Sequence, residues 1–425
     1  MHRRRGQRRK GLLSLGLGNS ADGRGAAGGA SPVAPRRAWL NRNVLGIGIA
    51  DFAADANYEM VFAVLPLFIT VGLGAPALAV GLVEGIGDGS SAVVKLWSGW
   101  YSDRIAWRKR VAVGGYGATV LGLGLLVAVT NWPQVIVART LAWMGRGLRQ
   151  PIRSAMLAGS VEKEDLGKAF GFHEALDTAG ALIGPAVAFF LLSTGSGFRT
   201  IFWVALVPGA LCVALFALIT RDPRRTRPEP VSLREPMPPG FWRLMTPVAI
   251  FGIGNFATAF FTLRAVQLVQ PELSHPAALA AAVAFYLAHN AVGAAVSFPA
   301  GWVADKVGKA PVLAAAYLSF AGACVVGIVA HGWLALALMA LLVGAQNPVV
   351  SGVEGSLTSS LVEERRLGTA FGLLNGINGV ADLGSSVTAG VLWTFVGPMA
   401  TLGFGAILCA VAGAVLWLRP PLRSN

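Results

Sequence analysis

Ionisable side chains recur inside otherwise apolar stretches of this chain, and their spacing places them on shared helix faces. Asp51, Asp55 and Glu59 stand four residues apart, which puts three carboxyls along one side of an α-helix. Four arginines within 139–153 fall inside about 80° of arc on a second helix. The acids and bases of the apolar stretches are Asp51, Asp55, Glu59, Glu84, Asp88, Glu174, Asp177, Glu354, Asp382, Lys95, Arg139, Arg146, Arg149, Arg153 and Arg264.

The chemistry that these groups suggest is proton transfer within a membrane. Inserting one charged side chain at a lipid-facing helix centre costs about 2.5–3.5 kcal/mol of free energy. Fifteen such side chains must therefore face one another or a wet cavity. A carboxyl can carry a proton when burial favours its neutral form and a moving arginine favours its charged form. We predict that Asp55, Glu59 and Asp177 carry protons, that Arg146 controls their charge, and that His173 relays protons. A packing role is the alternative for His173.

The remaining polar groups suggest a division of labour between the two parts of the chain. Most of the charges belong to the first part, which we expect to couple transport to an ion, whereas the second part is mostly neutral and contacts the cargo. Fixed ion pairs that only assemble the protein are the alternative. The residues expected to line the cavity are Asp88, Arg139, Glu354, Asn375, Asn378 and Asp382.

The elements that position these residues are membrane-spanning helices. Hydrophobic residues make up 54% of the 425 residues and charged residues 13%, against about a quarter charged in ordinary globular chains. Each apolar segment can span about 30 Å of hydrocarbon, and helices satisfy their own backbone groups in lipid. The twelve segments are 44–70, 76–98, 111–130, 134–157, 167–193, 198–219, 243–269, 277–300, 311–330, 333–357, 368–394 and 398–418.

Charge and composition divide the chain into two sets of six helices. We expect 28 of the 35 Lys and Arg residues on one side of the membrane, which predicts a multi-pass protein of the inner membrane with both termini cytoplasmic. The net charge of +14 therefore reports topology and not nucleic-acid binding. The expected parts are a disordered basic cytoplasmic tail (1–40), an N-terminal bundle (41–220), a cytoplasmic linker (221–242), a C-terminal bundle (243–418) and a cytoplasmic tail (419–425).

An internal repeat relates the two halves. Gly99-Trp-Tyr-Ser-Asp103-Arg104 after the second segment is matched by Gly301-Trp-Val-Ala-Asp305-Lys306 after the eighth, 202 residues later. The chain therefore resembles the major facilitator superfamily, whose G-x-x-x-D-[RK] motif follows the second helix. The resemblance implies twelve transmembrane helices in two pseudo-symmetric six-helix bundles, an all-α integral membrane fold. It also implies a cytoplasmic gate at Gly99, Asp103, Arg104, Gly301, Asp305 and Lys306.

A glycine pattern in the fifth segment resembles the antiporter motif of exporters in the same superfamily. It consists of Gly171, Gly180, Gly184 and Pro185. Small residues let this helix pack closely on a partner, and proline bends it. Tight packing without a role in export is the alternative. Further stretches around Glu59, Arg146 and His173 resemble a bacterial and archaeal branch of the superfamily.

We conclude that the sequence predicts a secondary active transporter with alternating access, and proton-coupled export of a small organic molecule. Proton-coupled uptake is the nearest alternative. A membrane-embedded magnesium-dependent transferase built on Asp51 and Asp55, or a receptor without transport, are alternatives from other classes. We expect no enzymatic activity, no cofactor, no metal and no nucleic acid. The expected partners are the cargo, protons and the lipid bilayer, and the expected working unit is a monomer.

Overall fold

The computed structural model describes residues 39–102, 107–222, 237–270, 272–363 and 366–421. In this part of the chain all regular elements are helices, so the predicted all-α class is confirmed. Several predicted features lie outside the described residues: the tail up to residue 38, Asp103 and Arg104 of the expected gate, most of the linker (223–236) and the last four residues.

The first bundle consists of α1 to α6. Asn41 caps α1, because its side chain accepts hydrogen bonds from the backbone of Asn43 and Val44, and a short π-helix continues α1. The elements are α1 (Arg42–Leu67), η1 (Phe68–Gly72), α2 (Ala77–Ser102), α3 (Arg108–Leu125), α4 (Trp132–Ala158), η2 (Lys163–Asp165), α5 (Leu166–Ser193) and α6 (Phe198–Ile219).

The second bundle consists of α7 to α13. Gly308, with a φ of 105°, provides the turn between α9 and α10, a conformation that other residues rarely adopt. The helices are α7 (Pro239–Gly254), α8 (Ala259–Val269), α9 (His275–Val307), α10 (Lys309–Val329), α11 (Gly332–Leu361), α12 (Leu367–Phe395) and α13 (Pro398–Leu418).

The predicted single helix over 243–269 is wrong in one respect, because the structure breaks it at residues 255–258. Its two parts, α7 and α8, meet at an angle of 43°. Two serines of α12 bind the polar groups that the break frees. Ser385 Oγ donates to the carbonyl of Asn255 at 3.2 Å, and Ser386 Oγ accepts from the amide of Ala257 at 3.3 Å. Broken helices with partnered backbone groups are typical of transporter sites.

Within the described residues, eight helices are long and apolar enough to cross a membrane, or nine if α7 and α8 form one bent span. The other three, α3, α4 and α12, are more polar. α3 begins with Arg108, Lys109 and Arg110, and α4 carries four arginines. All three pack beside the apolar helices of their own bundle. They complete the twelve predicted spans.

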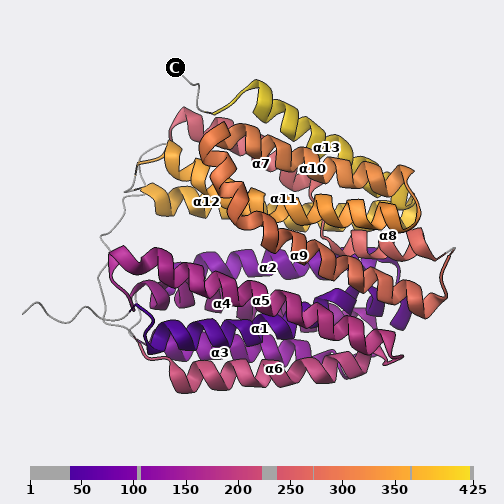
Figure 1. The fold of residues 1–425 in the computed structure, drawn as a ribbon, viewed down its shortest axis with the longest axis horizontal. Helices are drawn as coiled ribbons and strands as arrows, with labels where there is room; N and C mark the ends of the chain where they lie inside the picture. The colour runs from indigo at the N-terminus through magenta and orange to yellow at the C-terminus, as the bar shows by residue number, and fades with distance from the viewer. Residues whose placement is uncertain (1–38, 103–106, 223–236, 271, 364–365, 422–425) are drawn as a thin grey trace, which may run out of the picture. The chain divides into compact units, whose positions relative to one another are not determined.

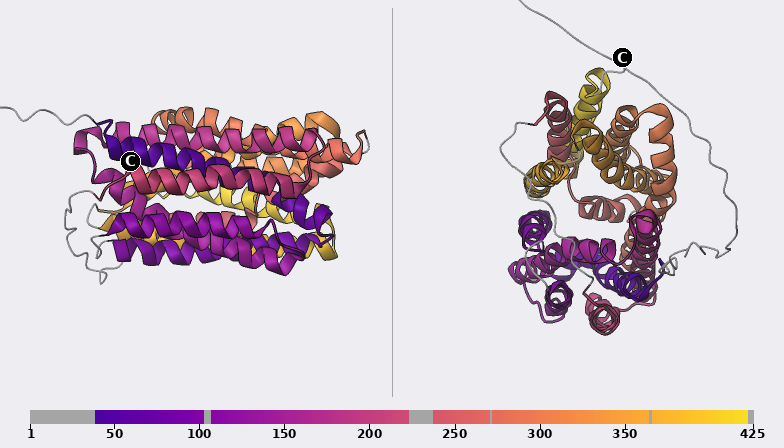
Figure 2. Two further views of the ribbon diagram at one scale, coloured as in Figure 1. Left: turned by 90° about the horizontal axis from the view of Figure 1, so that it is seen from below. Right: turned by 90° about the vertical axis from the view of Figure 1, so that its left-hand side faces the viewer.

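The two bundles repeat one packing order. In the first, α1 contacts α5 and α6, and α4 contacts α2 and α3. In the second, α7 contacts α12 and α13, and α11 contacts α9 and α10. Figure 2 shows the bundles as two separate groups of helices, seen along their axes in its right-hand view. The structure therefore has the predicted pair of pseudo-symmetric bundles.

The bundles meet along two equivalent helix pairs, α2 with α12 and α5 with α9. Gly85 of α2 lets the backbones approach, because a Cβ there would lie 2.9 Å from the carbonyl oxygen of Leu383. We call the end where α1, α5 and α12 begin the basic end, and the opposite end the far end; the basic end is on the left of Figure 1. The far end is closed, since Thr394 accepts a hydrogen bond from the amide of Leu78 at 2.8 Å.

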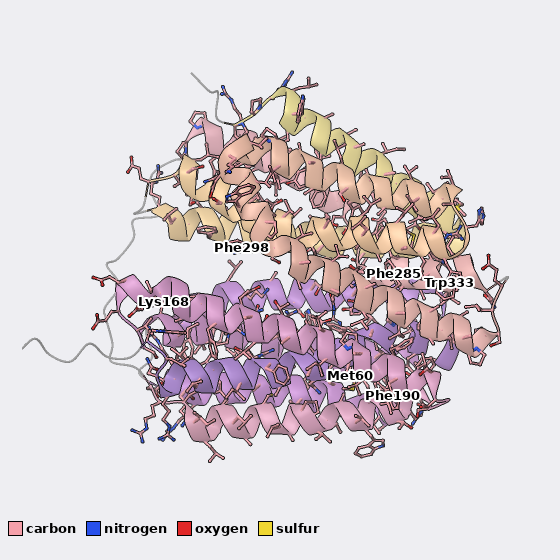
Figure 3. All side chains as sticks on the ribbon, viewed as in Figure 1. Met60, Lys168, Phe190, Phe285, Phe298 and Trp333 are labelled. Atoms are coloured by element: carbon pink, nitrogen blue, oxygen red, sulfur yellow. The ribbon has the colours of Figure 1, made fainter. Side chains whose placement is uncertain are left out.

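The contact between the bundles is lost toward the basic end. Phe298 of α9 lies there with 86% of its surface exposed, and Figure 3 shows it pointing toward the first bundle without reaching it. Trp97 of α2 and Val307 of α9 are also exposed. The opposite bundle therefore leaves these side chains uncovered, and we interpret the space between the bundles at the basic end as a vestibule.

Candidate functional site

Asp51 is the centre of a buried charged cluster between α1, α3, α4 and α5. Its carboxylate lies 3.2 Å from Arg149 Nη1 and 2.9 Å from Arg153 Nη1. His173 Nε2 lies 2.7 Å from the other carboxylate oxygen, and the Tyr116 hydroxyl donates a further hydrogen bond. His173, predicted as a proton relay, thus contacts Asp51 and not one of the predicted carriers. Two guanidiniums on Asp51 leave little room for a metal ion beside His173 and Asp177.

Two of the predicted proton carriers form a carboxyl pair. Asp55 of α1 is buried, and it lies next to Asp177 of α5, with which it lines the same cavity. Two neighbouring carboxyls can share a proton, because an ionised carboxylate only accepts hydrogen bonds and a protonated one can donate. Arg153 Nη1 lies 3.9 Å from Asp177.

Arg146 of α4 lies beside this pair without forming an ion pair with it in the described residues. Its guanidinium donates to the Tyr58 hydroxyl at 3.0 Å and covers the Tyr58 ring, 4.5 Å from the ring centre. It interacts electrostatically with both Asp55 and Glu59. Arg146 can therefore act on two predicted carriers at once.

The third predicted carrier, Glu59, connects the two bundles. Its carboxylate accepts a hydrogen bond from the Tyr286 hydroxyl at 2.8 Å and another from Asn290 Nδ2 at 3.2 Å, both from α9. The same Asn290 amide donates to the carbonyl of Ala181 on α5 at 3.2 Å. Glu59 thus lies at the place where the closed part of the interface gives way to the vestibule.

Arg139 binds two acids on α2. Its Nη2 lies 2.6 Å from Glu84 and 3.6 Å from Asp88, and its guanidinium carbon lies 3.3 Å from the centre of the Trp143 ring. Trp143 Nε1 donates to Asp88 at 2.6 Å. The guanidinium is therefore held between carboxylates and an aromatic face.

Two cavities lie between the bundles and share Glu59 and Asn347. The central cavity has a volume of about 270 Å³ and is enclosed by α1, α2, α4, α8, α9, α11, α12 and the break after α7. The side cavity has a volume of about 200 Å³ and lies between α1, α5, α9 and α11, next to Asp55 and Asp177. Of the predicted cavity residues, Asp88, Arg139 and Asp382 line the central cavity.

The other three predicted cavity residues lie elsewhere. Glu354 is buried in the second bundle, where it accepts hydrogen bonds from the Tyr317 hydroxyl at 2.7 Å and from Asn378 Nδ2 at 3.1 Å. Asn375 is exposed near the start of α12. Neither cavity is lined by Glu354, Asn375 or Asn378.

This second cluster matches the Asp51 cluster by the internal repeat. A tyrosine on the third span of each bundle donates to a buried carboxylate, which belongs to the first span in one bundle (Asp51) and to the fourth span in the other (Glu354). Three pairs of these residues are each 201 positions apart: Tyr116 and Tyr317, Arg153 and Glu354, Asp177 and Asn378. The duplication has therefore kept the location of the buried cluster in each bundle, whereas the charges of the residues at equivalent positions differ.

The described residues of the predicted gate do not bridge the bundles in this structure. No heavy atom would lie within 4 Å of a Cβ at Gly301, and Gly99 only just reaches Pro151, at 4.0 Å. Within the described part of the chain Asp305 is exposed and has no hydrogen bond or ion pair. Lys306 covers the ring of Trp302 on its own helix. The gate remains a prediction for a state closed at the basic end.

The glycines of the exporter-like motif differ in their surroundings. Gly180 and Gly184 of α5 face α1: a Cβ at Gly184 would lie 2.6 Å from the carbonyl oxygen of Ala56, and one at Gly180 would overlap the carbonyl of Phe52. Pro185 is buried beside them. Gly171 has open space around it. The close contact is therefore within the first bundle and holds Asp55 against Asp177.

The tyrosines of the site were not predicted from the sequence. The chain has only five tyrosines, and four of them bond to charged side chains of the clusters: Tyr58, Tyr116, Tyr286 and Tyr317. Their rarity inside apolar spans was the available signal, because a buried hydroxyl needs a partner. Gly81, Gly85 and Gly89 were a second missed signal, since their spacing of four predicts a close helix contact.

Comparisons with known proteins agree with this architecture. The family model of the Major Facilitator Superfamily matches residues 47–293 and 265–425. An uncharacterized MFS-type transporter of Methanocaldococcus jannaschii is 30% identical over 387 residues, which cover 89% of this chain and 94% of that protein. The multidrug resistance protein MdtG of Citrobacter koseri is 24% identical and covers 88% of this chain and 93% of its own length.

Solved structures share the fold at low sequence identity. The nucleoside transporter NupG has a TM-score of 0.73 at 11% identity, with 88% of this chain and 98% of that chain covered. The peptide transporter POT has a TM-score of 0.72 at 15% identity, with 90% and 95% covered. With the twin bundles, the repeat and the cavities between them, these matches show that the chain belongs to the Major Facilitator Superfamily of membrane transporters.

Proposed function

We propose that this transporter is a proton-coupled antiporter that exports a small organic molecule. The observation that carries the proposal is the pair of hydrogen bonds that Tyr286 and Asn290 donate across the interface to Glu59. Hydrogen bonds to an ionised carboxylate are about twice as strong as neutral ones, so protonation of Glu59 weakens this contact between the bundles. The charge of Glu59 is thereby linked to the position of one bundle relative to the other.

The state in which this contact forms favours antiport over uptake. Here the vestibule is open at the basic end, and ionised Glu59 stabilises that state. An antiporter must not reorient its binding site across the membrane when it holds neither cargo nor proton, because such a step dissipates the proton gradient. A symporter must make this reorientation while empty, because that step returns its site to the side where it binds cargo and proton. A contact that is strongest in the empty, deprotonated protein therefore suits an antiporter, and uptake is the second candidate.

The carboxyl pair of Asp55 and Asp177 provides a further proton in this proposal. A carboxyl pair that shares one proton can release it when a cation approaches. The cation then offsets the repulsion between the two negative charges that remain. Arg146 is the nearby cation that interacts with Asp55 and Glu59, and the Asp51 cluster fixes α4 and α5 around it. His173 in that cluster has a positioning role.

The proposed orientation places the basic end in the cytoplasm. Arg108, Lys109 and Arg110 begin α3 at this end, and Lys306 and Lys309 lie at the turn between α9 and α10. Basic residues concentrate on the cytoplasmic side of membrane proteins. We accordingly propose cytoplasmic termini, a cytoplasmic linker at 221–242 between bundles 41–220 and 243–418, and a location in the inner membrane.

The relatives support export more than uptake. The similarity to a multidrug resistance protein extends over most of both chains, although at 24% identity it does not identify a cargo. A transferase built on Asp51 and Asp55 is disfavoured, because Asp51 is paired with arginines and Asp55 faces Asp177. We therefore propose a transporter without enzymatic activity that works as a monomer.

Direction and coupling are tested in inside-out membrane vesicles. A screen by thermal stabilisation supplies the cargo, because a compound that binds the native state stabilises it by mass action. An exporter should accumulate this cargo in inside-out vesicles with an acid interior, as protons leave in exchange. Accumulation that needs an alkaline interior would show uptake in the cell and would reject the proposal.

Coupling variants separate transport from proton exchange. Glu59→Gln and Asp55→Asn should abolish accumulation driven by the pH gradient, because neither amide changes its charge. They should retain exchange of labelled for unlabelled cargo, which needs no net proton movement. Glu272→Gln, at an exposed site near the far end, is the matched control and should behave as the wild type. Unchanged gradient-driven accumulation in both coupling variants would contradict the assigned roles.

A further inference from the structure

The central cavity presents carboxyl groups to its contents. Among the described residues that line it, four are acids and one is a base. The acids come from both bundles, so a bound molecule would contact both. The ionisable lining residues are Glu59, Glu84, Asp88, Asp382 and Arg139.

The single lining base is already used by the protein. Arg139 is 2% exposed, lies 2.6 Å from Glu84 and is covered by the rings of Trp143 and Phe62. Its charge therefore neutralises Glu84 at the wall of the cavity. Asp88 is more accessible, with 33% of its side chain exposed and its nearest Arg139 nitrogen 3.6 Å away.

Asp382 of α12 is the acid that lacks a partner. Its side chain lines the cavity and is half-buried, and within the described residues it forms no ion pair and no side-chain hydrogen bond. Lys95 acts on Asp382 and Asp88 only at longer range and is not part of the lining. Glu354, buried in the same bundle outside the cavity lining, is a further acid near Asp382. A carboxylate that has no ion-pair partner and lies near other acids attracts a cation.

The other charged groups around the cavity do not reverse its sign. Arg146, which acts on Glu59, donates a hydrogen bond to the Tyr58 hydroxyl, and Arg153 forms an ion pair with Asp51. The adjoining side cavity adds Asp55 and Asp177, and its lining among the described residues includes the imidazole of His289 but no lysine or arginine. Apart from Arg139, which is paired with Glu84, the lysine, arginine and carboxyl groups of the described residues that line the two cavities are therefore all carboxyls.

Aromatic residues complete the lining. Phe62, Trp143, Phe256 and Tyr286 surround the acids. Aromatic faces attract cations, and Arg139 shows this chemistry inside the site, because its guanidinium lies on Trp143 between two carboxylates. Anionic cargo would be repelled by the unpaired Asp382, and neutral cargo could donate a hydrogen bond to it but could not neutralise its charge.

We infer that the cargo is a small organic cation with an apolar or aromatic body, and that Asp382 and Asp88 bind its charge. This inference rests on the proposed antiport. It also supplies a reason for the exchange: a cation and a proton neutralise the same carboxyls, so each displaces the other. A cavity of about 270 Å³ is of the size that holds a small organic molecule.

The test uses the purified full-length protein and two probes of similar size and opposite charge, benzyltrimethylammonium and phenylmethanesulfonate. Titration calorimetry at pH 8 should detect binding of the cation and not of the anion. The affinity for the cation should fall as the pH is lowered, because protons compete for the carboxyls. Equal or tighter binding of the anion, or no binding of the cation, would overturn the inference.

Variants locate the binding site. Asp382→Asn should raise the dissociation constant of benzyltrimethylammonium about tenfold or more, as expected for loss of a charge partner in a desolvated site. Asp88→Asn should weaken binding as well and guards against misfolding of the first variant. Glu272→Gln should leave the affinity unchanged. If both aspartate variants bind the cation as tightly as the wild type, the inference is wrong.

A second measurement distinguishes this inference from the proposed function. Spin labels at the exposed residues Lys168 and Val307, on α5 and α9 at the basic end, report the opening of the vestibule. If opening depends on pH but the cation does not bind, the inference fails and proton coupling stands. If the cation binds at Asp382 and opening does not depend on pH, proton coupling fails and the cargo class stands.

Discussion

Asp51 is enclosed by two guanidiniums, an imidazole and a phenol, and this density of partners makes it a structural residue. Asp51→Asn would leave the buried Arg149 without its counter-charge and Arg153 with only Asp177, at 3.9 Å. Loss of one partner of a buried ion pair costs about 3–5 kcal/mol. We predict a large fall in the melting temperature of purified Asp51→Asn and a low yield.

A matched surface variant provides the comparison. Asp165 pairs with Lys168 at 2.7 Å, but Lys168 is exposed, so Asp165→Asn should cost under about 1 kcal/mol. If Asp51→Asn were as stable as Asp165→Asn and lost proton coupling, Asp51 would be a proton carrier and not a structural residue.

The hydroxyl of Tyr286 has a different role, because it stabilises one conformation and not the fold. Tyr286→Phe removes one of the two hydrogen bonds to Glu59 and keeps the aromatic ring. A hydrogen bond to a charged group contributes about 1.5–3 kcal/mol, so the state open at the basic end should lose about tenfold or more in population. The distance between labels at Lys168 and Val307 should shorten at pH 8. An unchanged distance would show that Tyr286 does not hold this state.

At this scale the sequence identified the acids and arginines but not their pairing. A charge inside an apolar span is visible in any sequence, because its cost demands a partner. The choice between partners depends on depths and rotations of helices that spacing alone does not define. His173 illustrates this: it is four residues from Asp177 on α5, yet its ring contacts Asp51 of α1.

At the scale of helices, the contact between α2 and α12 depends on glycine. An ideal Cβ at Gly85 would lie 2.9 Å from the carbonyl oxygen of Leu383 and 3.1 Å from Val387. Gly85→Ala should therefore force the two helices apart, at a cost of about 1–3 kcal/mol in this state. We predict a lower melting temperature and a shorter distance between the basic-end labels. Gly114→Ala, where nothing lies within 4 Å of the new Cβ, should cause neither change.

The helix bounds were largely predictable, and the break in the seventh span was not. α6 and α13 begin and end at the predicted residues, because turn residues flank continuous apolar runs. The run over 243–269 contains Gly252, Gly254 and Asn255 at and just before the break, but glycine is frequent in continuous transmembrane helices, so these residues alone do not identify a break. Ser385 and Ser386, about 130 residues later, make the break possible by binding its backbone.

At the scale of the whole molecule, the repeat predicted the twin bundles, and the structure shows what duplication preserved. Equivalent positions hold Arg153 with Asp177 in one bundle and Glu354 with Asn378 in the other. The geometry is common to both, whereas the charges differ. The sequence could predict this asymmetry of charge but not that Glu354 lies outside both cavities.

Orientation belongs to this scale as well. We predict that a cysteine introduced at Lys168 reacts with a membrane-impermeant maleimide only when the cytoplasmic side is accessible, and one at Glu272 only from outside. The native cysteines, Cys212, Cys324 and Cys409, are buried and give a low background. Labelling of both sites from the same side would contradict the assigned topology.

The most direct test of proton-coupled opening is the distance between spin labels at Lys168 and Val307 as a function of pH, in wild type and in Glu59→Gln. Proton-coupled opening predicts a wild-type vestibule that is open at high pH and closes at the basic end as the pH falls. Glu59→Gln should favour the closed state already at high pH and respond little to pH. A wild-type distance independent of pH, or a Glu59→Gln curve that coincides with the wild type, would contradict the central claim.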